Sequence, residues 1–187
     1  VSIRPGWFYH AEEDTLVKTP ERLFEIYLTS VGRGSTLLLN LPPDRRGLIH
    51  ENDLAALKGW KELMDREFKK NHALNAVATA TNYRDNLQNF SPLNTTDGNK
   101  ETYWATDDSV KTGSLEISLS QNFPVKYVVL QEYIKLGQRI KSFRVEAWVG
   151  GNWKTIASAT TIGYKRILKL RPIETNKLRI TVLDSKA

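Results

Sequence analysis

The sequence predicts two structural classes in one chain: an α/β segment over residues 1–70 and an antiparallel all-β sandwich over residues 76–187, with residues 71–75 as a linker. Apolar residues recur at helical spacing in the first segment and at every second position in the last one. After residue 75, turn residues follow at short intervals and no long helical pattern remains.

The composition is that of a folded protein, and it excludes several classes of function. The 187 residues are 40% hydrophobic and 26% charged, unlike a disordered chain. Cysteine is absent, which excludes disulfides, cysteine nucleophiles and thiolate metal sites. The 27 basic and 21 acidic residues are interleaved, so the net charge of +6 does not indicate a nucleic-acid partner. No apolar run approaches the roughly 20 residues of a membrane span.

The α/β segment starts with a strand end at residues 1–3 and a loop at residues 4–10. Thr19-Pro20-Glu21 predicts a helix start, since a capping hydroxyl precedes a proline and an acidic residue. Gly32 is expected to end this helix. Its inward face is predicted to hold Leu23, Phe24, Tyr27, Leu28 and Val31.

A second strand is predicted at residues 36–40, followed by a loop at residues 41–50 and another helix. Because Leu37–Leu39 show no polar alternation, we expect this strand to be covered on both faces. Such an order is typical of a parallel sheet, and two βα units are about a quarter of a (β/α)8 barrel, which needs about 250 residues. The inward face of the second helix is predicted to hold Leu54, Leu57, Trp60, Met64 and Phe68.

In the all-β segment, apolar residues alternate with polar ones along three predicted strands. Gly150-Gly151-Asn152 predicts a tight hairpin turn. Together these features predict an antiparallel sandwich or barrel. The alternating apolar residues are Leu115, Ile117 and Leu119, then Phe143, Val145, Ala147 and Val149, then Leu178, Ile180 and Val182.

Motifs in both segments resemble known families. Residues 1–68 carry Arg4-Pro5-Gly6-Trp7-Phe8-Tyr9-His10, Gly32-Arg33-Gly34 and Leu38-Leu39-Asn40-Leu41-Pro42-Pro43-Asp44-Arg45-Arg46-Gly47, which resemble the end of the catalytic domain of glycoside hydrolase family 29 α-L-fucosidases. The second segment resembles a factor 5/8 type C (discoidin-like) domain of galactose-binding-like fold, a jelly roll. Its matching motifs are Asp97-Gly98-Asn99, Thr102-Tyr103-Trp104, Gly137-Gln138-Arg139-Ile140, Gly151-Asn152-Trp153 and Ile162-Gly163.

The resemblance implies that the two units of the first segment are the last two βα units of a (β/α)8 barrel. The chain is then the C-terminal region of a retaining exo-α-L-fucosidase that releases terminal fucose from glycans. Its aspartate nucleophile and acid/base glutamate are then expected before Val1, so this chain alone is expected to be inactive. A last strand is expected after Leu183–Ala187. The implied partners are a fucosylated oligosaccharide or glycoconjugate and the remainder of the barrel, in a secreted or periplasmic bacterial protein. The alternative is a non-catalytic glycan-binding or adhesion protein.

The acidic residues closest to the expected catalytic face are Glu12, Glu13 and Asp14. A retaining glycosidase needs two carboxyl groups about 5–5.5 Å apart on opposed faces of the sugar. Adjacent loop residues do not provide that arrangement, so these three are interpreted as a solvated loop before the helix.

Substrate-binding residues are expected in the loop at residues 4–10, because active sites of α/β barrels lie in the loops that follow the strands. Trp7 and Tyr9 are candidates to stack on a sugar ring, while Arg4 and His10 are candidates to hydrogen-bond hydroxyls or an active-site carboxylate. The alternative is that Pro5-Gly6 only shapes a turn and the aromatic residues pack under the barrel rim.

A structural calcium or sodium site is implied by the resemblance, with Asn94, Asp97, Asn99 and Thr102 as ligands. Oxygen ligands around a glycine turn suit calcium, which takes about six to eight of them. The alternative is an Asx turn without metal. No cofactor is expected for catalysis, and no histidine–carboxylate cluster suggests zinc. Trp104 is expected in the core and Trp148 on the opposite face, which leaves open whether the module binds glycan.

Overall fold

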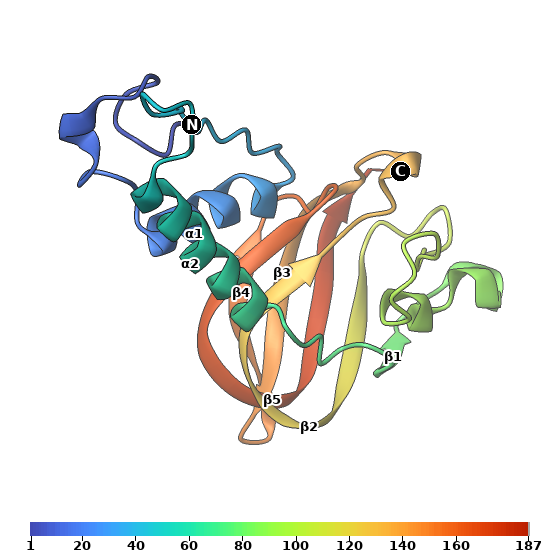
Figure 1. Cartoon of the computed structure of the whole chain (residues 1–187). Helices are drawn as coiled ribbons and strands as arrows, with labels where there is room; N and C mark the ends of the chain where they lie inside the picture. Colours follow the sequence, from blue (N-terminus) through green and yellow to red (C-terminus); the bar gives the residue numbers. More distant parts are fainter. Residues whose placement is uncertain (187) are drawn as a thin grey trace. The chain divides into compact units, whose positions relative to one another are not determined.

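The computed structural model describes residues 1–186; Ala187, the end of the predicted sandwich, lies outside the described residues. The chain divides into two compact units, Val1–Lys70 and the residues from Asn71 onward, which are coloured blue to green and green to red in Figure 1. We call them the α/β unit and the β unit. Within residues 1–186, no helix is long and apolar enough to cross a membrane.

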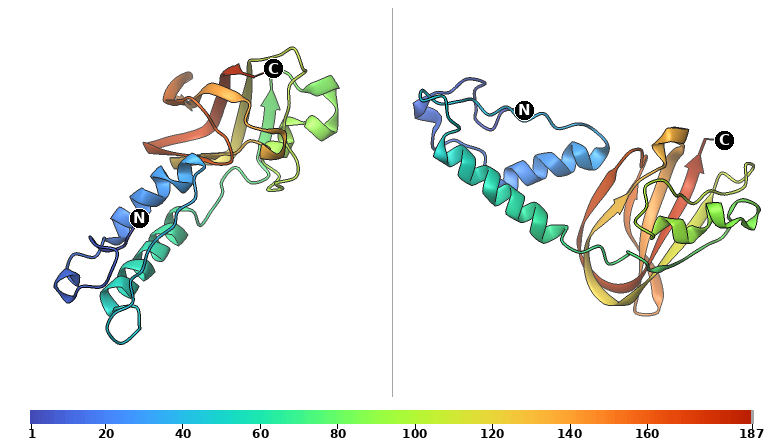
Figure 2. Two further views of the ribbon diagram at one scale, coloured as in Figure 1. Left: turned by 90° about the horizontal axis from the view of Figure 1, so that it is seen from above. Right: turned by 45° about the vertical axis from the view of Figure 1, so that its right-hand side comes forward.

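Helices α1 (Pro20–Thr29) and α2 (Glu51–Glu67) lie side by side in the α/β unit (Figure 2). As predicted, Thr19 caps α1: its hydroxyl accepts a hydrogen bond from the backbone N–H of Arg22 at 3.2 Å. The buried residues of α1 are Leu23, Phe24 and Leu28, as expected. The prediction that Gly32 ends the helix was wrong. A 3₁₀ turn at Val31–Arg33 follows, and Gly34 adopts the left-handed conformation, with φ of 82°.

The inward face of α2 differs from the prediction at its N-terminal end. Asp53 and Ala56 are buried, whereas Leu54 is 42% exposed. The physical reason is that the Asp53 carboxylate turns inward to meet a buried arginine, Arg4. Of the other predicted residues, Leu57 and Trp60 pack against the small core of Ile3, Leu23 and Ala56.

Residues 1–3 and 36–40 meet as parallel neighbours, but only through one isolated bridge between Ser2 and Asn40. The backbone N–H of Ile3 donates to the carbonyl of Asn40 at 3.0 Å, and that of Asn40 donates to the carbonyl of Val1 at 2.8 Å. The prediction of a strand over residues 36–40 was therefore wrong for this structure, in which only Asn40 forms a bridge, and Leu38 is 78% exposed in this chain. Its coverage by the rest of a barrel stays a prediction. No further strand among residues 1–186 pairs with this segment to extend the ladder. The barrel stays a prediction.

The β unit is one five-stranded antiparallel sheet in the order β1-β2-β5-β3-β4. Strands β2 and β5 are long and curve strongly (Figure 1). Their pairing shifts register between Ser118 and Phe123 and again between Val125 and Tyr127, and such irregularities bend a strand. The antiparallel all-β prediction is confirmed. The strands are β1 (Val77–Ala80), β2 (Gly113–Leu130), β3 (Ile140–Val149), β4 (Asn152–Ala159) and β5 (Arg166–Ser185).

The core of this unit lies on one face of the sheet. Its register places Phe143 opposite Val182, and Val145 opposite Ile180. All the predicted apolar positions of the three strands are buried except Val149, which is partly buried. Trp104 packs against this core, as predicted, and its Nε1–H donates to the carbonyl of Asn82 at 3.0 Å.

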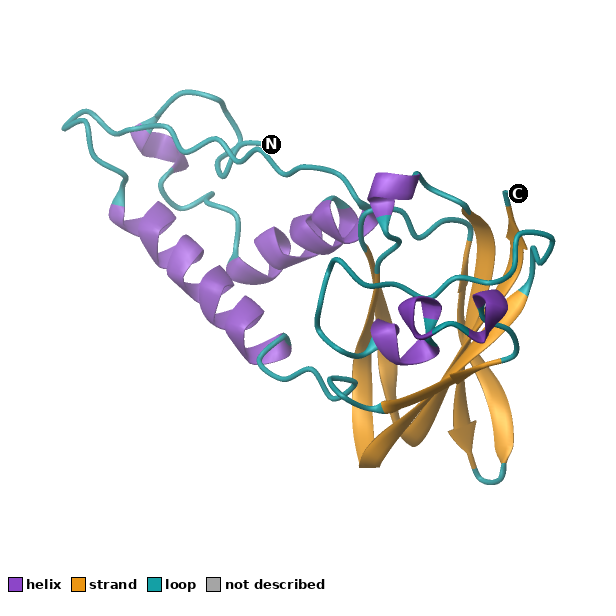
Figure 3. Ribbon diagram, turned by 90° about the vertical axis from the view of Figure 1, so that its right-hand side faces the viewer, coloured by secondary structure: helices purple, strands orange, loops and turns teal. Residues whose placement is uncertain are grey.

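Strands β3 and β4 are joined by the predicted hairpin. Gly150 and Gly151 have φ of 60° and 79°, as a type I′ turn requires at both central positions. The segment between β1 and β2 is irregular, with 3₁₀ turns at Arg84–Asn86, Gln88–Phe90 and Pro92–Thr95 (Figure 3).

Candidate functional site

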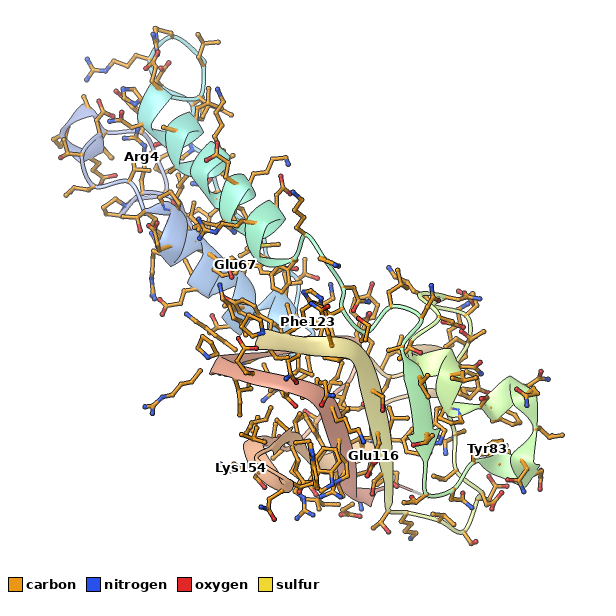
Figure 4. All side chains as sticks on the ribbon, turned by 90° about the horizontal axis from the view of Figure 1, so that it is seen from below. Arg4, Glu67, Tyr83, Glu116, Phe123 and Lys154 are labelled. Carbon is orange, nitrogen blue, oxygen red and sulfur yellow. The ribbon has the colours of Figure 1, made fainter. Side chains whose placement is uncertain are left out.

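The candidate site is the loop of residues 4–10, which we call the Arg4–His10 loop. At its start, the guanidinium Nε of Arg4 lies 3.1 and 3.0 Å from the two carboxylate oxygens of Asp53. Its Nη1 donates to Asp14 at 2.8 Å and to the backbone carbonyl of His10 at 3.3 Å. The side chains of Arg4 and Asp53 are 0% exposed. Figure 4 shows Arg4 among the loops near the N-terminal end of α2.

Asp14 connects this ion pair to two further side chains. Its carboxylate accepts a hydrogen bond from the Tyr9 hydroxyl at 3.2 Å and lies 3.3 Å from Nε2 of His50. Burial by itself would raise the pKa of Asp14, but the hydrogen bond from Arg4, the charge of His50 and the hydrogen bond from Tyr9 lower it overall. Asp14 is therefore held as the anion. The ring of Tyr9 faces the guanidinium of Arg4 at 4.8 Å.

The backbone of the loop is held by contacts from three other places. The Ser2 hydroxyl donates to the carbonyl of Gly6 at 2.7 Å, and the N–H of Gly6 donates to Glu13 at 3.3 Å. The side-chain amide of Asn40 donates to the carbonyl of Trp7 at 2.9 Å. Because these contacts fix the backbone, the loop presents the Trp7 side chain, 60% exposed in this chain, at a defined place.

The predicted substrate-binding residues share this loop, but their side chains lie in two different environments. Arg4 and Tyr9 take part in the ion network, whereas Trp7 and His10 are exposed. Phe8, which is 79% exposed, was missed from the candidates although it stands between two of them. Contact of these residues with a sugar stays a prediction.

Asp14 and Asp53 are functional candidates that the sequence did not single out. Asp14 was interpreted as part of a solvated loop with Glu12 and Glu13, yet it is an ion-pair partner of Arg4. The sequence showed only that Asp53 is an acidic residue in the first turn of a predicted helix. Acidic residues are favoured there whether they are buried or exposed. Nothing local distinguishes a buried acid from an exposed one there.

The predicted metal ligands lie in a turn of the β unit. One carboxylate oxygen of Asp97 accepts from the N–H of Asn99 at 2.8 Å, and the other accepts from the Thr102 hydroxyl at 2.6 Å. Gly98 between them has φ of 75°. The Asn94 amide instead donates to the carbonyl of Tyr103 at 3.0 Å. The geometry is that of an Asx turn, and its oxygens are the type that calcium takes.

Among residues 1–186, no group of three or more histidine, cysteine, aspartate or glutamate side chains is placed to hold a metal ion. A calcium site built from carbonyl, hydroxyl and single carboxylate oxygens is of a different kind. Calcium at Asp97 stays a prediction.

An aromatic pair, Trp148 and Trp153, lies on the face of the sheet opposite to the core. The rings of Trp148 and Trp153 meet edge to face at 5.2 Å, and the guanidinium of Arg179 lies 4.4 Å from the Trp153 ring centroid. Arg179 also donates two hydrogen bonds of 2.9 Å to Glu146. Hydrogen bonds from Arg179 and Thr181 lower the pKa of Glu146 to about 2, although burial opposes the shift.

The fold of the β unit is that of the galactose-binding-like class: an antiparallel module with its core on one face of a curved sheet. Residues 75–187 match the F5/8 type C domain family, and the chain belongs to this family.

Similarity to enzymes extends over the whole chain. Alpha-L-fucosidase 1 of Arabidopsis thaliana is 36% identical over 186 residues, which cover 97% of this chain and 36% of that protein. A Ruminococcus gnavus GH29 fucosidase, solved in complex with fucose, is 33% identical with a TM-score of 0.90, over 99% of this chain and 38% of its own. The structure of SpGH29 is 38% identical with a TM-score of 0.92, over 100% of this chain and 40% of its own.

The chain thus spans little more than a third of the length, 36%, of the curated relatives it matches. The curated relative is an α-L-fucosidase, and the Ruminococcus gnavus protein is a GH29 fucosidase. A chitosan-binding module of Paenibacillus sp. IK-5 shares the fold of part of the chain, with a TM-score of 0.55 at 22% identity over 63% of it.

Proposed function

We propose that this chain is part of a retaining exo-α-L-fucosidase that hydrolyses terminal fucose from glycans. The observation that carries the proposal is the match over nearly the whole chain to family 29 fucosidases, including one solved with fucose. The α/β unit would then complete the catalytic barrel, with the nucleophile and the acid/base in the remainder of the protein.

In this proposal the Arg4–His10 loop forms part of the fucose-pocket wall. Trp7 is exposed on a fixed backbone, which suits an indole that stacks on the C–H face of a sugar. His10 has a side chain that is 54% exposed; its Nδ1 lies 3.8 Å from Glu12, and its Nε2 is the ring nitrogen that would meet a sugar hydroxyl. The β unit serves as an accessory carbohydrate-binding-type module, and we place the whole protein outside the cytoplasm, where extended glycans occur.

The test is release of fucose by the full-length protein that contains this chain, from aryl α-L-fucosides and from fucosylated oligosaccharides. Retention predicts that the first product observed by NMR is the α-anomer. Trp7→Ala should lower kcat/KM by about tenfold or more, as loss of a stacking contact does. Tyr164→Ala is the matched control, because Tyr164 is similarly exposed, at 56%, but lies in the β unit. No fucose release from either substrate class would refute the proposal.

We also propose calcium at the Asp97 turn. Asp97, Asn99 and Thr102 already lie within hydrogen-bond distance of one another, so little rearrangement is needed for their oxygens to turn to one cation. Asn94 would supply its carbonyl oxygen as a further ligand, while its side-chain amide donates to the carbonyl of Tyr103 at 3.0 Å. Bound calcium would supply structural stability and no step of the chemistry. Calorimetric titration with calcium should show binding that Asp97→Ala removes, whereas no heat with the parent protein would refute the site.

A further inference from the structure

We propose that Arg4 is a positioning residue: its buried guanidinium orders the Arg4–His10 loop so that Trp7 faces the sugar, and Arg4 does not itself touch the sugar. The inference rests on the proposed function and deepens it, because it assigns how that wall of the pocket is held. It differs from the sequence-based expectation, in which Arg4 hydrogen-bonds the substrate.

The first step of the argument is that Arg4 has no surface to offer a ligand. Its side chain is 0% exposed within this chain. Nε and Nη1 are taken by Asp53, Asp14 and the carbonyl of His10. The remaining nitrogen, Nη2, is buried and has no hydrogen-bond partner among the described residues. A donor enclosed in this way reaches a sugar hydroxyl only if the loop opens.

The second step is that the contacts of Arg4 join three separate segments. Asp53 belongs to the first turn of α2, Asp14 follows the Arg4–His10 loop, and Arg4 is the first residue of that loop. Lys18 adds a fourth contact, since its ammonium donates to the carbonyls of Ser2 and Arg4 at 2.7 and 3.3 Å. A buried ion pair contributes little net stability relative to apolar residues, but its directional bonds fix one arrangement.

The third step is that the fixed arrangement includes Trp7. With Arg4 held at one end of the loop and Asp14 just beyond the other, Ser2, Glu13 and Asn40 hold the backbone of Gly6 and Trp7 between them. A displacement of about 1 Å in a substrate-positioning group costs up to about 100-fold in rate. The ion pair of Arg4 therefore affects substrate binding indirectly, through the position of the Trp7 indole.

The experiment compares variants of the full-length protein that contains this chain. Arg4→Lys keeps the charge but loses the planar fork that contacts two carboxylates, and Asp14→Asn removes one partner whose side chain is 24% exposed, so that folding survives. We expect kcat/KM for an aryl α-L-fucoside to fall by about tenfold, mostly through KM. Amide hydrogen exchange of the Arg4–His10 loop should rise in both variants.

Leu28→Ala is the control, because Leu28 is buried on α1 but does not belong to the core cluster of Ile3, Leu23 and Ala56, so its loss destabilises the same unit. It should lower Tm and leave KM unchanged. Monodeoxy-fucosides separate positioning from contact. If Arg4 positions the loop, the Arg4→Lys penalty is the same for the fucoside and for each deoxy analogue. If Arg4 binds a hydroxyl, the penalty disappears for the analogue that lacks it.

Three results would overturn the proposal: kinetic constants within about twofold of the parent in Arg4→Lys and Asp14→Asn, a rise in KM of the same size in Leu28→Ala, or an Arg4→Lys penalty that disappears for one deoxy analogue. If Arg4→Lys fails to fold, Asp14→Asn decides alone. A parent protein that releases no fucose refutes the proposed function instead. Unchanged loop exchange in both variants would then also refute the ordering role of Arg4.

Discussion

Replacing Glu146 by glutamine should destabilise the β unit at neutral pH and leave it unchanged in strong acid. Glu146 is 5% exposed and accepts hydrogen bonds of 2.9 Å from two nitrogens of Arg179 and one of 3.1 Å from Thr181. Breaking a buried ion pair costs about 3–5 kcal/mol of the free energy of unfolding. Because glutamine keeps a hydrogen-bond acceptor and Arg179 is partly exposed, we expect Glu146→Gln to lower the free energy of unfolding by about 2–3 kcal/mol.

The pH dependence follows from the lowered pKa of Glu146. The ordinary value is 4.5 and the folded value is about 2, lowered first by the hydrogen bonds of Arg179. The stabilisation is therefore complete above the unfolded pKa and is lost as pH falls through the folded pKa. The difference in unfolding free energy between parent and variant should shrink from pH 4.5 to about pH 2.

The assay is urea unfolding followed by tryptophan fluorescence in a Trp7→Phe, Trp60→Phe background, so that Trp104, Trp148 and Trp153 report the β unit. Glu174→Gln, an exposed position on β5, the strand that also carries Arg179, is the matched control and should stay within about 0.5 kcal/mol of the parent. Equal stability of the Glu146 variant and the parent at pH 7, or a difference that persists unchanged at pH 2, would refute the reasoning.

Three further variants test the packing and the turns by the same unfolding measurements. Phe143→Ala removes a ring that is 0% exposed and should cost about 3–5 kcal/mol, against almost nothing for the 45% exposed Leu183→Ala; equal costs would contradict the core. Thr19→Ala should cost the α/β unit about 1 kcal/mol, and no loss would contradict the cap. Gly151→Ala should cost about 1 kcal/mol because φ there is 79°, and a neutral result would contradict the type I′ turn.

The sequence predicted features that depend on neighbouring residues. The cap at Thr19, the alternation along β3 and the glycine turn at Gly150 all appear where expected. These features follow from local sterics and hydrogen bonding, which the order of residues specifies directly. The motifs of residues 76–187 also predicted the F5/8 type C family, and the similarity to fucosidases was expected from the first segment.

Features that join distant residues required the tertiary structure. The Ser2–Asn40 bridge forms as a single parallel contact, and residues 36–39 stay outside any strand, because a strand forms only where a neighbouring strand supplies a run of backbone hydrogen-bond partners. The strand order β1-β2-β5-β3-β4 and the curvature of β2 and β5 likewise depend on pairing across the chain.

The candidate site shows the same division. The sequence by itself determined which loop to consider, because Arg4, Trp7, Tyr9 and His10 stand together in one motif. Only the tertiary structure decided that Arg4 turns inward, since its partner Asp53 is 49 residues away and becomes its neighbour through folding. The side chain of an arginine is the same in either role; the acids that surround it decide whether it is buried in an ion pair or left to meet a ligand.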